Sequence, residues 1–168
     1  MLAIILVISG VLLRFAPHAP NFTPVAAIAI FAGAYLKKRH AIIVPLALMM
    51  VSDLFLGLHD VVIFTWGGFV IAALLGVWVK KERGFLRITL ASLSSSLIFF
   101  IISNFGVWLM GWYPRTLSGL TNCYIMALPF LRNFTLATLL YTAALYAIYE
   151  FVARTVKNTK LEKALLIN

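Results

Sequence analysis

The residues Arg14-Phe-Ala-Pro-His-Ala-Pro-Asn-Phe-Thr-Pro24 form a polar break between two apolar segments in the first third of the chain. Three prolines in this stretch, at positions 17, 20 and 24, remove backbone donors and push the residues before them out of helical conformation. The stretch, called the proline loop below, therefore cannot continue a helix from either side. Irregular backbone in a membrane protein is tolerated only at the surface, buried in protein or lining a cavity, so the proline loop is a candidate binding segment.

The composition around the proline loop is that of an integral membrane protein. Hydrophobic residues make up 63% of the 168 residues and charged residues only 11%, whereas about 25% of a globular protein is charged. At about 20 residues for each membrane crossing, the chain is long enough for roughly six or seven spans. Little is left for a soluble domain, so we expect a single membrane domain over residues 1–168.

Apolar runs separated by polar or basic residues predict an all-α bundle of six transmembrane helices. We expect spans at residues 1–15, 25–36, 41–58, 61–79, 85–110 and 131–152, followed by a basic tail over residues 153–168 that suits the membrane surface. Residues 111–122 are expected to form a loop. The apolar piece 123–130 stops at Pro129 and is interpreted as a re-entrant or interfacial segment. A cleaved signal peptide is the alternative for residues 1–13, which lack a preceding basic residue and a clear cleavage motif.

The basic residues predict which way the bundle faces. Eleven of the fourteen Lys and Arg residues follow the second, fourth and sixth spans, and the other three are Arg14, Arg115 and Arg132. By the positive-inside rule, both termini are then cytoplasmic in an inner (cytoplasmic) membrane, and the proline loop, His59–Asp60 and residues 111–122 face outward. A net charge of +9 would suggest nucleic acid as a partner of a soluble protein, but short basic clusters between apolar runs argue against it.

Ionisable and amide side chains are expected at one depth below the outer loops. Asp53 and Asn104 each lie near the outer end of a span, and Arg132 and Asn133 lie at the expected start of the sixth. At 1.5 Å rise per residue, these positions share one level of the bilayer. Two interpretations stay open: a structural ion pair between Asp53 and Arg132, or a ligand site to which these side chains contribute.

Signatures of catalysis and of metal binding are missing from the sequence. No Gly-x-Ser-x-Gly, His-Glu-x-x-His or Walker sequence is present, so an enzyme is not expected and ATP cannot be bound through a P-loop. His18 and His59, with Asp53 or Asp60, are the candidates for a metal site, but no His-x-x-x-His or Cys-x-x-Cys spacing supports one. We therefore expect neither metal nor cofactor, and interpret His18 as a hydrogen-bonding member of the proline loop.

Several motifs resemble those of an uncharacterised bacterial family described as membrane transport proteins. These motifs are Arg14-Phe-x-Pro-His-x-Pro-Asn-Phe-x-Pro24, Ser52-Asp53, Ser103-Asn-Phe-x-Val-Trp108, Tyr113-Pro-x-Thr-x-x-Gly-Leu-x-x-Cys-Tyr124 and Pro129-Phe-x-Arg-Asn133. That family in turn resembles the substrate-binding S components of energy-coupling factor (ECF) transporters. The resemblance implies six helices, two cytoplasmic termini and a ligand pocket that is roofed by the outer loops, with the proline loop as a lid.

S components capture a vitamin or related micronutrient outside the cell and then dock on a transmembrane coupling protein that is driven by two ATPases. Their docking face, which is rich in small residues, lies on the first helix, whereas the clearest small-residue pair here, Ala29 and Gly33, lies on the second expected span. Such a pair fits a helix contact within the protein or with a partner, and both interpretations stay open.

Two hypotheses about function follow from these observations. The first is a substrate-binding subunit of an importer for a micronutrient, a vitamin or precursor, which depends on partner ATPases for energy. Its ligand would be surrounded by a polar shell of Arg14, His18, Asn21, Asp53, Asn104, Arg132 and Asn133. The second is a non-catalytic structural accessory subunit that packs against a larger membrane protein complex.

Overall fold

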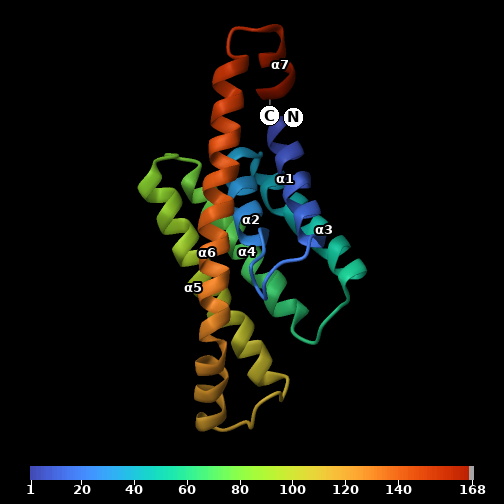
Figure 1. The fold of residues 1–168 in the computed structure, drawn as a ribbon, viewed down its shortest axis with the longest axis vertical. Coiled ribbons are helices and arrows are strands. Elements are labelled where there is room, and N and C mark those ends of the chain that lie inside the picture. The colour runs from blue at the N-terminus through green and yellow to red at the C-terminus, as the bar shows by residue number, and fades with distance from the viewer. Residues whose placement is uncertain (167–168) are drawn as a thin grey trace.

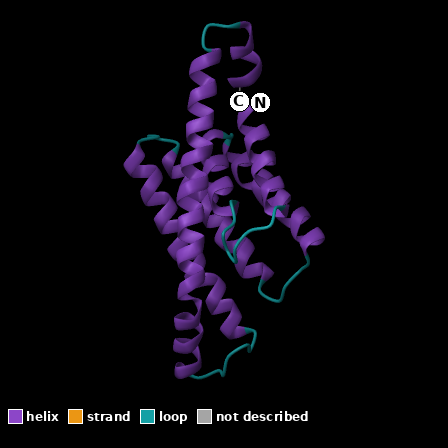
Figure 2. Cartoon of the chain, in the orientation of Figure 1, coloured by secondary structure: helices purple, strands orange, loops and turns teal. Residues whose placement is uncertain are grey.

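The computed structural model describes residues 1–166 as an assembly of helices (Figure 1). Figure 2 shows helices joined by loops, with no strand in this part of the chain. The elements are α1 (Leu2–Leu12), a short 3-10 helix η1 (Leu13–Phe15), α2 (Val25–Tyr35), α3 (Lys38–Leu56), α4 (Val62–Val79), α5 (Phe85–Leu109), α6 (Leu117–Val156) and α7 (Lys160–Leu166).

Four of these helices are long and apolar enough to cross a membrane. They are α3, α4, α5 and α6, which confirms an all-helical protein of membrane type. The first two apolar segments form shorter helices, since α1 and η1 have 11 and 3 residues and α2 has 11. At 1.5 Å per residue, α2 is about 17 Å long, against a hydrocarbon core of about 30 Å. The arrangement of six full spans therefore stays a prediction.

The short helix α2 is the centre of the molecule. Every one of its residues is buried, and it packs against α1, α3, α4, α5 and α6. The closest approach is to α4, where a Cβ atom added to Gly33 would lie 2.7 Å from the Cα atom of Gly76. Only glycine lets the two backbones come so near. The small-residue face of α2 is therefore used for packing within the protein.

Helix α6 differs from the prediction for residues 111–130. It begins at Leu117 and continues for 40 residues with Pro129 inside it, so the expected loop ends earlier and no re-entrant segment exists. Thr116 is extended and its side chain accepts a hydrogen bond from the amide of Gly119, which fixes the start of the helix. Proline is tolerated within apolar helices of membrane proteins because neighbouring groups satisfy the freed carbonyl.

The two termini lie at the same end of the molecule, with α7 beside the start of α1 (Figure 1). The amino group of Met1 donates to the carbonyl oxygen of Leu165 at 3.0 Å. The connections from α2 to α3 and from α4 to α5, which carry Lys37, Lys80, Lys81 and Arg83, belong to this end as well. The proline loop, the α3–α4 connection and the α5–α6 connection point toward the opposite end.

An aromatic cluster holds the bundle together on the side of the termini. The rings of Phe31 and Tyr35 on α2 contact those of Tyr146 and Tyr149 on α6, with centroids 3.9 to 5.8 Å apart. The hydroxyl of Tyr35 also donates to the carboxylate of Glu150 at 2.9 Å. These contacts join α2 to α6 away from the proline loop, and they close the end of the core that lies near the termini.

Candidate functional site

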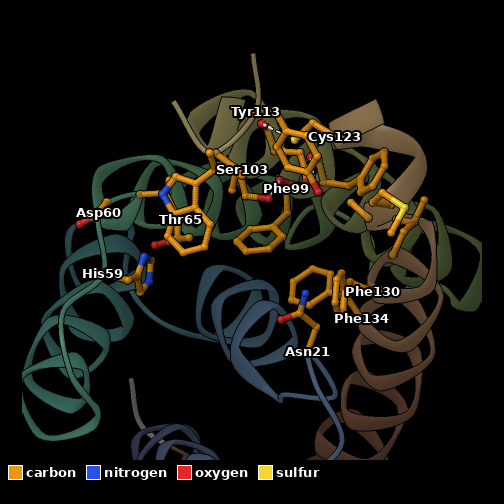
Figure 3. Close-up of a pocket in the computed structure, with 18 residues that line it drawn as sticks. Asn21, His59, Asp60, Thr65, Phe99, Ser103, Tyr113, Cys123, Phe130 and Phe134 are labelled. Carbon is orange, nitrogen blue, oxygen red and sulfur yellow. Dashed lines mark hydrogen bonds between the residues drawn. The ribbon is translucent and has the colours of Figure 1, made fainter. Parts of the chain in front are cut away.

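A cavity of about 480 Å³ lies between the proline loop, the α3–α4 connection, the α5–α6 connection and helices α4, α5 and α6 (Figure 3). Three loops that are far apart in the sequence thus line one space, as their expected common position predicts. The lining residues are Asn21, His59, Asp60, Val61, Thr65, Phe99, Phe100, Ser103, Asn104, Val107, Trp112, Tyr113, Cys123, Met126, Ala127, Phe130, Leu131 and Phe134.

A smaller cavity of about 150 Å³ adjoins the first. Both are lined by Asn21, His59, Thr65, Phe99 and Phe134, so the two spaces share part of their walls. The smaller one also reaches two charged side chains that the sequence places in the polar shell, Arg14 and Asp53. The candidate site therefore consists of two adjoining cavities, a smaller one that borders an ion pair and a larger one that is mostly apolar.

The carboxylate of Asp53 is fully engaged by groups of the protein itself. One oxygen accepts from the guanidinium of Arg14 at 2.9 Å, and the other accepts from the indole nitrogen of Trp66 at 2.7 Å. Arg14 also donates to the hydroxyl of Ser52. The ion pair is largely buried, with 14% of the Arg14 side chain and 6% of the Asp53 side chain exposed. It ties η1, α3 and α4 together.

An ion pair between Asp53 and Arg132, one of the two interpretations that the sequence left open, is therefore wrong. Because α6 begins at Leu117, Arg132 lies fifteen residues inside the helix and not at its start. Its side chain is exposed, lines neither cavity, and makes no hydrogen bond or ion pair with any residue that the structure describes. The structure thus removes Arg132 from the predicted polar shell.

Asn104 is the predicted shell residue that the structure places in the wall of the larger cavity from α5. Its side-chain nitrogen donates to the carbonyl oxygen of Phe100, one turn earlier, at 2.8 Å. Its side-chain oxygen accepts no hydrogen bond from the described residues, so it is available to a ligand that donates one. Ser103 lines the same wall, and its hydroxyl donates to the carbonyl oxygen of Phe99 at 2.7 Å.

The proline loop contributes unequally to the site. Asn21 lines both cavities and has a φ of 59°, a left-handed conformation that asparagine tolerates better than most residues. Asn133 does not line a cavity, but its side-chain nitrogen donates to the carbonyl oxygen of Pro20 at 3.1 Å and holds the loop against α6. His18 is exposed and outside both cavities, and its Nδ1 lies 2.7 Å from the carbonyl oxygen of Ala16.

The contact between Pro20 and Asn133 shows how deep the proline loop lies. Asn133 comes sixteen residues after the first residue of α6, which is about 24 Å along the helix axis. The loop therefore borders the cavity from inside the bundle and does not cover the outer ends of the helices, in contrast to the expected lid. Trp112 and Tyr113 of the α5–α6 connection line the other side of the cavity.

Sequence reasoning missed a stack of aromatic rings, of which Phe99 and Phe134 line both cavities and Phe69 lines the smaller one. Phe69, Phe99 and Phe134 come from α4, α5 and α6, and their rings stack with centroids 5.0 and 4.4 Å apart and interplanar angles of 19° and 21°. In the sequence these residues are indistinguishable from ordinary core phenylalanines. His59, which we considered only for a metal, lines both cavities. No group of three possible metal ligands occurs among the described residues.

Comparison with curated proteins and with solved structures gives no match to this chain. The resemblance to S components therefore stays an expectation from the motifs. A family of unknown function, DUF6580, matches residues 1–161, so the chain belongs to this family.

Proposed function

We propose that the protein is the substrate-binding subunit of an importer, which captures a small molecule such as a micronutrient at the end of the bundle opposite the termini. The observation that carries this proposal is the cavity of about 480 Å³ that residues 21, 59 and 113 of three separate loops line together. Ligand sites are typically concave and mostly apolar, with a few polar groups that fix orientation. The aromatic rings, Asn104 and Asn21 match that description.

Energy for transport would come from other proteins. The chain has no P-loop sequence with which to bind ATP, so we propose that it associates with a transmembrane coupling protein and ATPases. This part of the proposal is supported by the resemblance of its motifs to S components. The location in the inner membrane, with the cavity facing outward, is supported by the eleven basic residues on the side of the termini.

A ligand screen with a matched pair of variants tests the capture of a small molecule. Ala127 lines the cavity and is 5% exposed, whereas its neighbour Leu128 is 53% exposed and does not line it. Ala127→Trp should fill the cavity, and Leu128→Trp adds the same bulk outside. A ligand at about 100 times its Kd should stabilise the wild-type protein and Leu128→Trp by about 2.7 kcal/mol, and Ala127→Trp not at all.

Asn104→Ala is a milder second variant, for which weaker stabilisation by the same ligand is expected because a cavity-wall amide is lost. The screen would cover vitamins and their precursors, together with mass spectrometry of small molecules that co-purify with the protein. If nothing binds in either measurement, the proposal is rejected.

The structural accessory subunit remains the second candidate, because the Arg14–Asp53–Trp66 contacts lock three helices without any ligand. It predicts a stoichiometric membrane partner without an associated ATPase, and no effect of Asn104→Ala on any transport. Purification in a mild detergent, with identification of the associated chains, distinguishes the two candidates.

A further inference from the structure

The walls of the larger cavity carry aromatic rings, one acidic side chain and one imidazole, but no lysine or arginine. Of the eighteen residues that line it, Asp60 is acidic, His59 contributes an imidazole, and none is Lys or Arg. Asp60 is exposed and lies at the margin of the site (Figure 3), so the interior is lined by amide, hydroxyl and imidazole groups and by ring faces. An anion that entered would lose its hydration without gaining a charged partner, which is costly.

Arg14, Arg115 and Arg132 are all outside the wall of the larger cavity. Arg14 borders the smaller cavity, but its guanidinium is in the ion pair with Asp53. Arg115 in the α5–α6 connection donates to the carbonyl oxygen of Leu109 at 3.0 Å and does not line the cavity. Arg132 is exposed and lines neither cavity. A carboxylate or phosphate on a ligand would find no lysine or arginine in these walls to pair with.

Aromatic rings face the same space from three elements. Phe100 belongs to α5 and Phe130 to α6, while Trp112 and Tyr113 come from the connection between them. Figure 3 shows Tyr113 and Phe130 among the side chains around this space. The faces of such rings carry partial negative charge, so they attract cations and stack on flat rings. The polar groups between them are amides and hydroxyls, which can pair with donors or acceptors on a neutral molecule.

We infer that the cavity takes a flat aromatic ring compound that is uncharged or positively charged, and that it rejects anionic rings. This inference rests on the proposed function, because it names the class of ligand for the same site. Stacking on the rings would hold the body of the ligand, and Asn21, Thr65 and Asn104 would pair with its polar edge. Asp60 at the rim would add to the preference for positive charge.

Thiol reagents of different charge can measure this preference without knowledge of the ligand. Cys123 is the only cysteine, so Cys123→Ala gives a background in which Ser103→Cys places a single thiol in the cavity wall. Three methanethiosulfonates would be compared, with a benzyl group, a trimethylammonium group and a sulfonate group. Each forms a mixed disulfide with the cysteine thiolate and releases methanesulfinate, and the gain in protein mass gives the rate.

Two controls distinguish the effect of the cavity on the reaction rates from the intrinsic reactivity of the reagents and from reaction at the protein surface. Rates are first divided by those with free 2-mercaptoethanol, which removes intrinsic reactivity. Ser118→Cys then reports an exposed position near the start of α6, at the same end of the molecule but outside the cavity. Thr65→Cys on the α4 wall is a second cavity variant, in case Ser103→Cys does not fold.

The ratio of the sulfonate rate to the trimethylammonium rate should be about tenfold lower at Ser103→Cys than at Ser118→Cys. A difference of this size is expected for the effect of one charge at roughly 10 Å. The benzyl reagent should modify the cavity cysteine readily. Adding Asp60→Asn should reduce the difference between the two charged reagents. An equal or faster reaction of the sulfonate in the cavity overturns the inference, and so does a cavity cysteine that no reagent modifies.

The two proposals fail in different ways. A charge preference at Ser103→Cys with no ligand in the stability screen would leave the charge preference of the cavity standing but reject ligand capture, and with it the assignment of a ligand class. A carboxylate or phosphate compound that stabilises the wild-type protein but not Ala127→Trp would leave capture standing and reject the charge preference.

Discussion

The ion pair between Arg14 and Asp53 is the single contact that most clearly links the proline loop to the helical bundle. Arg14 is the first residue of the proline loop and lies in η1, and Asp53 lies near the end of α3. Trp66 on α4 completes the group through the second carboxylate oxygen. Loss of one partner would leave a charge in a largely buried position, which costs more free energy than the pair itself contributes.

Asp53→Asn should therefore lower the free energy of unfolding by about 3 kcal/mol, because it leaves the Arg14 guanidinium unpaired. The exposed arginine provides the control, since Arg132→Gln removes no described partner and should change stability by less than about 0.5 kcal/mol. Thermal unfolding of both variants in the same detergent measures the difference. Equal losses of stability in the two variants would show that the Arg14–Asp53 ion pair stabilises the protein no more than the exposed Arg132 does.

For single residues, the sequence predicted the burial of Asp53 but not its partner. The acid was correctly expected to be buried near the end of the third span, and it is 4% exposed. Its partner was wrong because the depth of Arg132 was counted from an expected helix start at residue 131, and α6 begins fourteen residues earlier. Arg14 was named for the site, but no spacing rule relates positions on different helices, so the pairing required the structure.

Among the elements, the contact between α2 and α4 sets how tightly the bundle is packed. A Cβ atom on Gly76 would overlap the carbonyl oxygen of Ile30, and one on Gly33 would overlap the carbonyl oxygen of Ala73. These neighbours are backbone atoms, which cannot turn aside as a side chain can. The helices would have to separate to admit even one methyl group.

Gly76→Ala should destabilise the protein by about 1 to 3 kcal/mol, the usual cost of overpacking a core. Gly67, on the same helix, is the matched control, because a Cβ atom there meets nothing within 4 Å. Gly67→Ala should be neutral or stabilising by up to about 1 kcal/mol, since alanine favours the helix over glycine. If the two substitutions shift the unfolding temperature alike, the close approach of α2 and α4 is not rigid.

The helices differ in how well the sequence predicts them. Expected spans at 61–79 and 85–110 agree with α4 (Val62–Val79) and α5 (Phe85–Leu109), since basic residues or a tight polar turn mark their ends. Pro129 suggested a break in α6, but in an apolar helix one proline removes a single hydrogen bond while the tertiary contacts on both sides persist. The cap at Thr116 was the local signal for the true start.

For the molecule as a whole, the deep position of the proline loop follows from the shortness of the central helix α2. Because α2 has only 11 residues, its first residue does not reach the level at which α4 begins and α5 ends, and the proline loop must enter the bundle to meet it. The cavity is the space between the longer helices on the side of the loop away from the termini. Hydropathy predicts apolar segments but not how far each extends through a bundle, so the cavity was visible only in three dimensions.

The orientation of this cavity in the membrane can be tested with single cysteines that leave every charge in place. In the Cys123→Ala background, Ser118→Cys lies on the side of the cavity, and Thr155→Cys lies in the last turn of α6 near the termini. Because eleven of the fourteen basic residues are on the side of the termini, that side should face the cytoplasm. A membrane-impermeant maleimide should then label Ser118→Cys in right-side-out vesicles, and Thr155→Cys only in inverted ones. The reverse pattern would open the cavity to the cytoplasm and exclude capture from outside, whereas labelling of both cysteines from one side would contradict α6 as a span.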